Sequence, residues 1–453
     1  MSIKLRLTVM SFFQFFVWGA WLITIANYWF GTKQWDGTQF GAIFATMGIA
    51  ALFMPTLMGI IADRWVNAEK LYGILHLLYA GTLFYLPQVN DPQQFFYVML
   101  LAMCFYMPTL ALSNSISYTA LTEGKYDLVK AFPPIRVWGT IGFIAAMWLV
   151  NLSGNKATAH QFHIAGAAAL ALSLFSLTLP KCPPKNIGSE KKTLVQSFGL
   201  EAFKLFTNYK MALFFIFSMF LGAALQLTNA YGDVFLDEFK FYPKYVNLIV
   251  IKYSTIIMSI SQISETLFIL AIPFFLKRFG IKNVMLIAMF AWVLRFGLFA
   301  YGDPDSGLWM IVLSCIVYGM AFDFFNISGS LFVESSTSPQ IRSSAQGLFM
   351  MMTNGFGAVL GSLVSGWVID YYFTLKFTDA NGLANYLQTD TTNELLGKFI
   401  HERGSSILPD GLLSAEILLK DWHHIWLAFA AYTLVIAILF AVLFRHKHEK
   451  TVS

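Results

Sequence analysis

Residues 257–276 read IMSISQISETLFILAIPFFL, a stretch in which Glu265 is the only charged side chain. A membrane-spanning helix needs about 20 predominantly apolar residues, so this stretch is long enough to cross a bilayer. A carboxyl group in hydrocarbon is costly, and residues of this kind therefore mark functional sites. The stretch predicts a membrane helix that carries a functional acid.

The same pattern recurs along the chain. Hydrophobic residues make up 57% of the 453 residues and charged residues 12%, whereas soluble proteins are about 25% charged. The apolar runs lack the short alternation that membrane β-barrels show. We therefore expect an all-α membrane protein with twelve transmembrane helices. The segments are 7–32, 37–62, 71–90, 92–122, 137–155, 157–180, 211–232, 253–276, 283–302, 306–333, 343–369 and 422–444.

A polar and basic connection at 181–210 divides the helices six and six. Its part near 200–206 predicts a surface amphipathic helix. We expect an N-terminal six-helix bundle at 1–180, a cytoplasmic linker at 181–210 and a C-terminal six-helix bundle at 211–453. Similar charged turns follow the second helix (59–65) and the eighth (275–280), which suits transporters built from repeated halves that rock about a central site.

A polar outer loop, 374–421, interrupts the second bundle and predicts a short helix near 392–402. A passive insertion is favoured over a lid, because no chemistry can be assigned to the loop. Basic residues concentrate on one side of the membrane if both termini are cytoplasmic, which is the positive-inside bias. We expect a monomeric, multi-pass protein of the cell inner membrane, with its first apolar segment retained as a helix rather than cleaved as a signal.

Several classes of protein do not fit these residues. The net charge of +5 is not gathered into one block, so no nucleic-acid partner is expected. Cys104, Cys182 and Cys315 have no metal-ligand spacing and read as two apolar fillers and a loop thiol. No phosphate-binding loop and no nucleophile–base set occurs, so we expect neither an enzyme nor a cofactor. A transmembrane gradient is the remaining energy source.

The fifth helix opens with FPPIRVWGTIGF at 132–143. Arg136, Thr140 and Phe143 are spaced i, i+4, i+7, so they share one face. A guanidinium, a hydroxyl and an aromatic ring on one stripe can form the wall of a ligand site. The alternative is that Arg136, which lies near the helix end, extends to the membrane interface.

Two helices carry paired polar residues at i, i+3: Gln226 with Asn229, and Gln262 with Glu265. Amides donate and accept hydrogen bonds, which suits base edges or sugar hydroxyls. The alternative is that the amides join neighbouring helices, as they do in many membrane proteins. His76 reads as a packed or hydrogen-bonded imidazole rather than a proton relay.

The tenth helix places Tyr318, Phe322 and Asn326 on one face at i, i+4, i+8, with Asp323 one residue round. Burial favours the neutral form of a carboxyl, so Asp323 can take up a proton and release it when the site rehydrates. The alternative is a static ion pair, for which Arg295 is a candidate. The ninth helix is expected to be peripheral, so a structural role is favoured for Arg295.

The chain resembles the bacterial nucleoside:proton symporters of the major facilitator superfamily. The strings that carry the resemblance are FPPIRVWGTIGF (132–143), SMFLGAALQLTN (218–229), IMSISQISETLFILAIPFFL (257–276), YGMAFDFFNISGS (318–330) and SAQGLFMMMTNGFG (344–357). The resemblance covers nearly the whole chain except 374–421, which is longer than the family leads us to expect.

The resemblance implies the major facilitator fold and a nucleoside cavity between the two bundles. It also implies that protons and a nucleoside are the partners, and that Asp323 and Glu265 serve proton coupling. At Ala224 some relatives carry a Glu, which leaves the number of protons open. The binding positions implied are Arg136, Thr140, Phe143, Gln226, Asn229, Gln262, Glu265, Tyr318 and Phe322.

The residues alone leave the substrate open. Proton-coupled nucleoside uptake by alternating access is the first hypothesis. A symporter of another polar solute, such as a sugar, is the alternative, because sugars use the same amides and carboxylates. A membrane receptor without a transport cycle is disfavoured by the acids in mid-membrane and by the symmetry of the helices.

Overall fold

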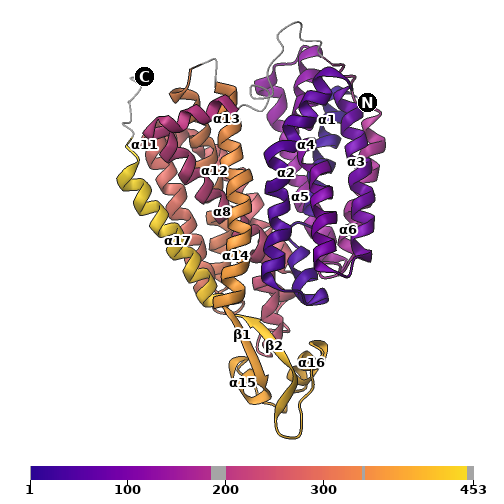
Figure 1. The fold of residues 1–453 in the computed structure, drawn as a ribbon, viewed down its shortest axis with the longest axis vertical. Coiled ribbons are helices and arrows are strands. Elements are labelled where there is room, and N and C mark those ends of the chain that lie inside the picture. The colour runs from indigo at the N-terminus through magenta and orange to yellow at the C-terminus, as the bar shows by residue number, and fades with distance from the viewer. Residues whose placement is uncertain (1, 185–199, 339–341, 446–453) are drawn as a thin grey trace.

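The computed structural model describes residues 2–184, 200–338 and 342–445. It contains two groups of helices that stand side by side, with both described chain ends at the same end of the molecule (Figure 1). A small two-stranded sheet lies at the opposite end. Half of the expected linker at 181–210, residues 185–199, lies outside the described ranges.

The first group is formed by the helices from α1 to α6. Its elements are α1 (Ile3–Gly19), η1 (Asn27–Lys33), α2 (Gly37–Arg64), α3 (Ala68–Tyr85), η2 (Leu86–Gln88), α4 (Pro92–Glu123), α5 (Leu128–Leu152) and α6 (His160–Ser176).

The second group begins with η3 and ends with α17. Its elements are η3 (Leu200–Thr207), α8 (Tyr209–Glu238), η4 (Phe239–Phe241), α9 (Ile249–Lys252), α10 (Ser254–Met258), α11 (Ile260–Tyr301), α12 (Leu308–Ser336), α13 (Arg342–Met350), η5 (Met351–Gly357), α14 (Ala358–Tyr372), β1 (Thr374–Asp379), α15 (Ala380–Tyr386), α16 (Glu394–Glu402), β2 (Leu412–Lys420) and α17 (Trp422–Leu443).

The described helices account for twelve crossings. Eight helical segments are long and apolar enough to span a membrane by length and composition. One of them, 254–301, bends at Gly280, whose φ of 74° is a left-handed conformation that favours glycine, and it supplies two crossings. The shorter helices α1, α3 and α6 supply three more. The charged turn expected near 275–280 is therefore a single-residue kink.

Side-chain caps fix where several crossings begin. Asp36 accepts a hydrogen bond from the Gln39 amide at 2.8 Å at the start of α2, and Asp91 accepts one from the Gln94 amide at 2.6 Å at the start of α4. Such caps satisfy amides that have no partner within the helix. The long apolar runs form the helices, and the polar capping residues set where those helices begin.

The outer loop has more structure than the sequence predicted. Its helix near 392–402 is present as α16, and β1 pairs antiparallel with β2 at its base. Apolar side chains from α15, α16 and β2, including Leu383, Leu396 and Ile417, form a separate small core. We call residues 374–421 the outer subdomain. The segment near 200–206 forms the 3₁₀ helix η3 rather than an α-helix.

Close packing of α1 on α5 depends on Gly142. A Cβ atom built at Gly142 would lie 2.0 Å from the carbonyl oxygen of Phe12, and backbone atoms cannot give way cheaply. We expect Gly142→Ala to lower the free energy of unfolding by about 1–3 kcal/mol, measured as thermal stability of the purified protein. Gly297→Ala is the matched control, because nothing lies within 4 Å of its added Cβ. Equal stability of both variants would contradict this packing.

Candidate functional site

Three ionisable side chains from both groups of helices lie near enough to one another to interact electrostatically. Arg136 on α5 interacts electrostatically with Glu265 on α11 and with Asp323 on α12, and the two acids act on each other. Arg136 and Glu265 are half-buried, whereas Asp323 is only 5% exposed. The sequence argument placed these residues on separate helix faces, and the fold brings those faces together.

The first group supplies one wall of this site from α5 and α1. The guanidinium of Arg136 lies 4.0 Å from the centre of the Phe15 ring, a cation–π contact that holds it in the protein interior rather than at an interface. Thr140 follows one turn along α5 and is half-buried. Phe143 packs edge-on against Trp18, with ring centres 6.3 Å apart.

The second group supplies amides and aromatic rings. Gln226 on α8 is buried and Gln262 on α11 is half-buried, and the Oε1 atom of each has no hydrogen-bond partner among the described residues. The same holds for Oδ2 of Asp323. A buried polar atom without a partner costs about 1–3 kcal/mol. A polar ligand with hydroxyl or N–H groups can donate hydrogen bonds to these oxygen atoms.

Tyr318 and Phe322 form a flat surface one turn apart on α12. Their rings are stacked with an interplanar angle of 9° and centres 6.1 Å apart, and Trp292 meets Tyr318 edge-on. Tyr318 is buried, while Phe322 is half-buried. Because Asp323 follows Phe322 directly, the aromatic surface and the buried acid share one segment of α12.

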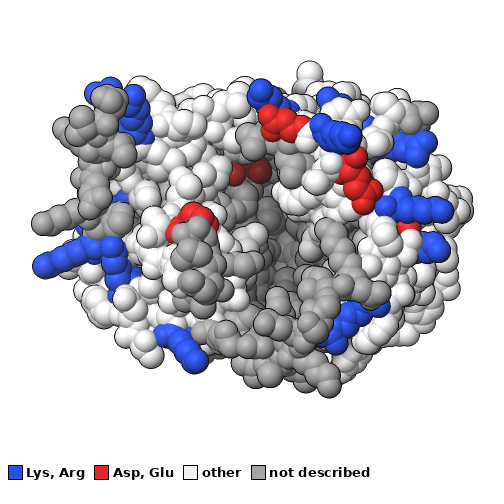
Figure 2. All heavy atoms as spheres, turned by 90° about the horizontal axis from the view of Figure 1, so that it is seen from above, with Lys and Arg blue, Asp and Glu red and all other residues white. Residues whose placement is uncertain are grey.

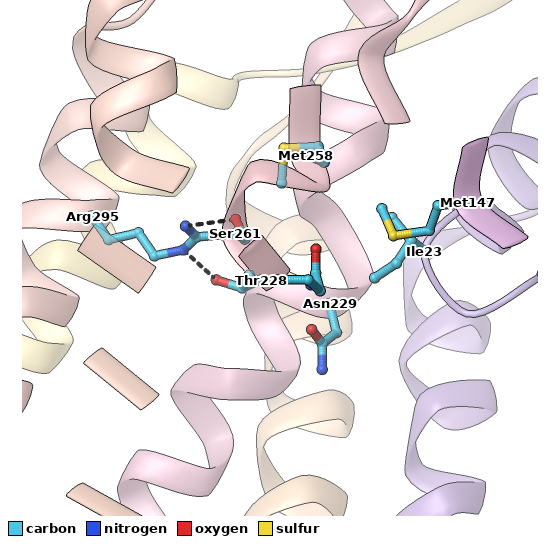
Figure 3. Close-up of a pocket in the computed structure, with 8 residues that line it drawn as sticks. Ile23, Met147, Thr228, Asn229, Met258, Ser261 and Arg295 are labelled. Atoms are coloured by element: carbon cyan, nitrogen blue, oxygen red, sulfur yellow. Dashed lines mark hydrogen bonds between the residues drawn. The ribbon is translucent and has the colours of Figure 1, made fainter. Parts of the chain in front are cut away.

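Arg295 lies deeper in the second group than the sequence suggested. It is fully buried, and its Nη1 atom donates to the Ser314 carbonyl at 2.7 Å while its Nε donates to Thr228 Oγ1 at 3.2 Å. A longer bond of 3.4 Å reaches Ser261 Oγ (Figure 3). None of the described carboxylates forms an ion pair with it, so the pairing considered with Asp323 is not present.

The contacts of Arg295 connect it to the site. Thr228 precedes Asn229, Ser261 precedes Gln262, and the guanidinium lies 4.7 Å from the Tyr318 ring centre. A pocket at the seam between the groups joins these residues (Figure 3). It is lined by Ile23, Met147, Thr228, Asn229, Met258, Ser261, Gln262 and Arg295.

The apolar residues that line this pocket could not be predicted from the sequence. Ile23, Met147 and Met258 are ordinary apolar residues, and only their contact across the seam makes them part of the pocket. His76, by contrast, is buried with its Nδ1 atom 3.0 Å from the Tyr72 carbonyl oxygen, which confirms the prediction of a packed imidazole.

The two groups are joined at the end opposite the termini. Trp148 Nε1 donates to Ser259 Oγ at 2.9 Å, and Asn151 Nδ2 donates to the Lys252 carbonyl at 3.1 Å. Asp370 on α14 accepts from the Gly37 amide at 2.9 Å at the start of α2. From the end that carries the termini the surface is hollowed between the groups (Figure 2). The site therefore opens toward the termini and is closed at the other end.

The outer subdomain contacts the first group at the closed end. Arg403 Nη1 donates to the Phe30 carbonyl at 3.3 Å, and Gln34 Nε2 donates to the Glu402 carbonyl at 3.0 Å. The Lys420 ammonium lies 3.5 Å from the centre of the Phe30 ring. The subdomain thus bridges the seam instead of standing apart from it.

A membrane transporter with two halves around a central polar site is the class that this fold and geometry define. Structures below 25% identity share the fold, including a bacterial homologue of the lysosomal transporter Spinster (TM-score 0.63, 14% identity, 98% of this chain and 94% of that chain). The family model described as nucleoside H+ symporter matches residues 1–449. The chain belongs to this family, as its resemblance led us to expect.

Individual relatives are similar over their full length. Nucleoside permease NupG of Escherichia coli (strain K12) is 48% identical, over 99% of this chain and 98% of the relative. The xanthosine permease of the same organism is also 48% identical, over 99% and 97%. The crystal structure of nucleoside transporter NupG in its D323A form superimposes with a TM-score of 0.86 at 47% identity, over 98% of this chain and 100% of that chain.

The opening of the site toward the termini can be tested with cysteine labelling. In a variant without native cysteines, we expect Thr140→Cys to react with a hydrophilic thiol reagent, because Thr140 is half-buried on the face of α5 that carries Arg136. Val150→Cys is the matched control on the same helix, where the side chain is fully buried near the closed end. Equal rates, measured by mass spectrometry, would contradict an opening at one end only.

Proposed function

We propose that this chain takes up nucleosides together with protons by alternating access. The observation that carries the proposal is that Arg136 of one half interacts with Glu265 and Asp323 of the other. A ligand held at this point contacts both halves, as a substrate passed between two access states must. The full-length similarity to a nucleoside permease and a xanthosine permease supports the choice of substrate.

The chemistry of the site suits an uncharged nucleoside. A flat base can pack on the aromatic surface of Tyr318 and Phe322, and the free acceptors of Gln226 and Gln262 can take hydrogen bonds from ribose hydroxyls or base N–H groups. A phosphate group would meet two carboxyls with one guanidinium to compensate, so nucleotides fit less well than nucleosides.

Charge balance supports coupling to protons. With both acids ionised, the cluster of Arg136, Glu265 and Asp323 carries one excess negative charge in a poorly hydrated interior. One proton shared by the two acids makes the cluster neutral, and coupled acids of this kind titrate as a unit. We assign the binding role to Arg136, Thr140, Phe143, Gln226, Asn229, Gln262, Glu265, Tyr318 and Phe322, and proton coupling to Asp323 and Glu265.

The topology proposed for the chain follows from its charge distribution. We place both termini in the cytoplasm and the protein in the inner membrane as a monomer, because the basic residues then lie on the inner side. The hollow of Figure 2 would face the cytoplasm. The bundles extend over 1–180 and 211–453, with 181–210 as the linker between them.

We expect Asp323→Asn to abolish uptake against a gradient, because the amide cannot carry a proton. The measurement uses purified protein in liposomes with an imposed pH gradient and a panel of labelled nucleosides, with hexoses as competitors. Exchange of nucleoside between equal concentrations should persist, since that step needs no net proton movement. Concentrative uptake at the wild-type level would refute the coupling role, and competition by hexoses alone would refute the substrate class.

We expect Phe322→Ala to raise the dissociation constant for a nucleoside by about tenfold or more, because base–aromatic stacking contributes about 1–3 kcal/mol. Calorimetric titration of the purified protein measures this change. Phe274→Ala is the matched control, since Phe274 is an exposed aromatic residue on α11. An unchanged constant would remove Phe322 from the site.

A further inference from the structure

A second buried group of charges lies at the closed end, away from the substrate site. Asp233 and Asp237 stand one turn apart on α8, and both are nearly inaccessible. Across the seam, Asn27 Nδ2 donates to Asp233 Oδ2, and Lys156 forms an ion pair with Asp237. One half thus contributes two acids and the other half contributes an amide and an ammonium.

The two acids are not equivalent. Asp237 accepts from Lys156 and also from Lys240, whose Nζ lies 2.7 Å from its Oδ2 atom. Lys156 in addition donates to Ser254 Oγ at 2.8 Å. Asp233 has no ammonium in direct contact among the described residues, and its neutral neighbour is an amide. Asp237 therefore stays ionised as the counter-ion of Lys156 and Lys240. Asp233 is the acid that can become protonated without leaving a lysine unpaired.

The hydrogen bonds of Asp233 point to a missing donor. Asp233 and Asn27 are each 1% exposed, and in the part of the chain that the structure describes the Oδ1 atom of each has no hydrogen-bond partner. Thr255 lies close enough to act on the carboxyl but not in hydrogen-bond geometry. An ionised carboxylate only accepts, as does an amide oxygen, so neither can satisfy the other. A protonated carboxyl has an O–H that can donate, and an acid and an amide can then exchange two hydrogen bonds.

We propose that Asp233 is a second proton-binding site, at the seam of the closed end, and that its proton stabilises the closed state of that end. The inference rests on the alternating access of the proposed function but not on the substrate. Opening this end separates Asn27 and Lys156 from α8 and exposes Asp233 to water, where the ionised form is favoured. The closed state therefore binds the proton more tightly, and by linkage a lower pH favours closure.

This proton differs from the coupled one. The substrate site opens toward the termini while Asp233 is enclosed at the other end, so the proton on Asp233 returns to the side from which it came. This proton controls how readily the outer end opens. It is not transported across the membrane. The groups that act on Asp233 most strongly are Lys156 from the α5–α6 connection, Asp237 from α8, Asn27 from η1 and Thr255 from α10.

The test measures opening without substrate or transport, so its failure is distinct from failure of the proposed function. Spin labels on Gln93→Cys and Lys398→Cys, both exposed on opposite halves at the outer end, report the distance across the seam. The background lacks native cysteines and carries Glu265→Gln and Asp323→Asn, so the substrate-site acids cannot titrate. Between pH 8.5 and 5.5 in sodium-free buffer, we expect the closed-to-open ratio to rise by up to about tenfold per pH unit, the limit for one proton.

Variants of Asp233 show whether the pH response and the closed state depend on this residue. Asp233→Asn supplies the missing donor from its own amide, so this variant should stay closed at every pH. Asp233→Ala lacks that donor and should lose the pH response without staying closed. Asp237→Asn, the matched control, should favour opening yet keep the pH response. A pH response that survives in Asp233→Asn, or that is absent from the background, would overturn the proposal.

Discussion

The structure depends on the electrostatic interaction between one guanidinium and two carboxyls across the seam of two helical groups. Arg136 belongs to the first group, and Glu265 and Asp323 belong to the second. Bringing three charges together in a poorly hydrated interior is costly unless they balance. Because each half supplies part of this cluster, the interaction links the arrangement of the halves to the protonation of the acids and to any ligand between them.

The second requirement is that the site be held in shape while the halves move. Arg295 serves the second group in this respect, since its hydrogen bonds reach Thr228, Ser261 and the Ser314 carbonyl on three helical segments. Each of these bonds lies within one half, so none has to break when the seam opens. Other contacts cross the seam, among them the hydrogen bonds that Asp370 accepts from Gly37 and Thr38 and the ion pair between Lys156 and Asp237. When the seam opens, water can replace these partners.

The sequence predicted those features that depend on local pattern. Long apolar runs predicted the crossings, and helical spacing placed Tyr318 and Phe322 on one face, as their stacked rings show. Features that depend on distant parts of the chain had no such signal. The partners of Arg295 lie 19 or more residues away in the chain. The bond between Asn27 and Asp233 joins residues 206 apart, and β1 pairs with β2 across more than thirty residues of chain. The roles assigned to the site residues remain predictions.

The outer subdomain illustrates how a peripheral insertion can matter without chemistry of its own. It has its own core, with Leu383 and Leu396 buried in it, and its strands connect directly to α14 and α17. Its contacts to the first group include those of Arg403 and Lys420 with Phe30 and the hydrogen bond from Gln34 to the Glu402 carbonyl. Those contacts must part when the outer end opens. Because these contacts exist only while the outer end is closed, an insertion of this kind favours the closed state of that end. It does so without changing the substrate site.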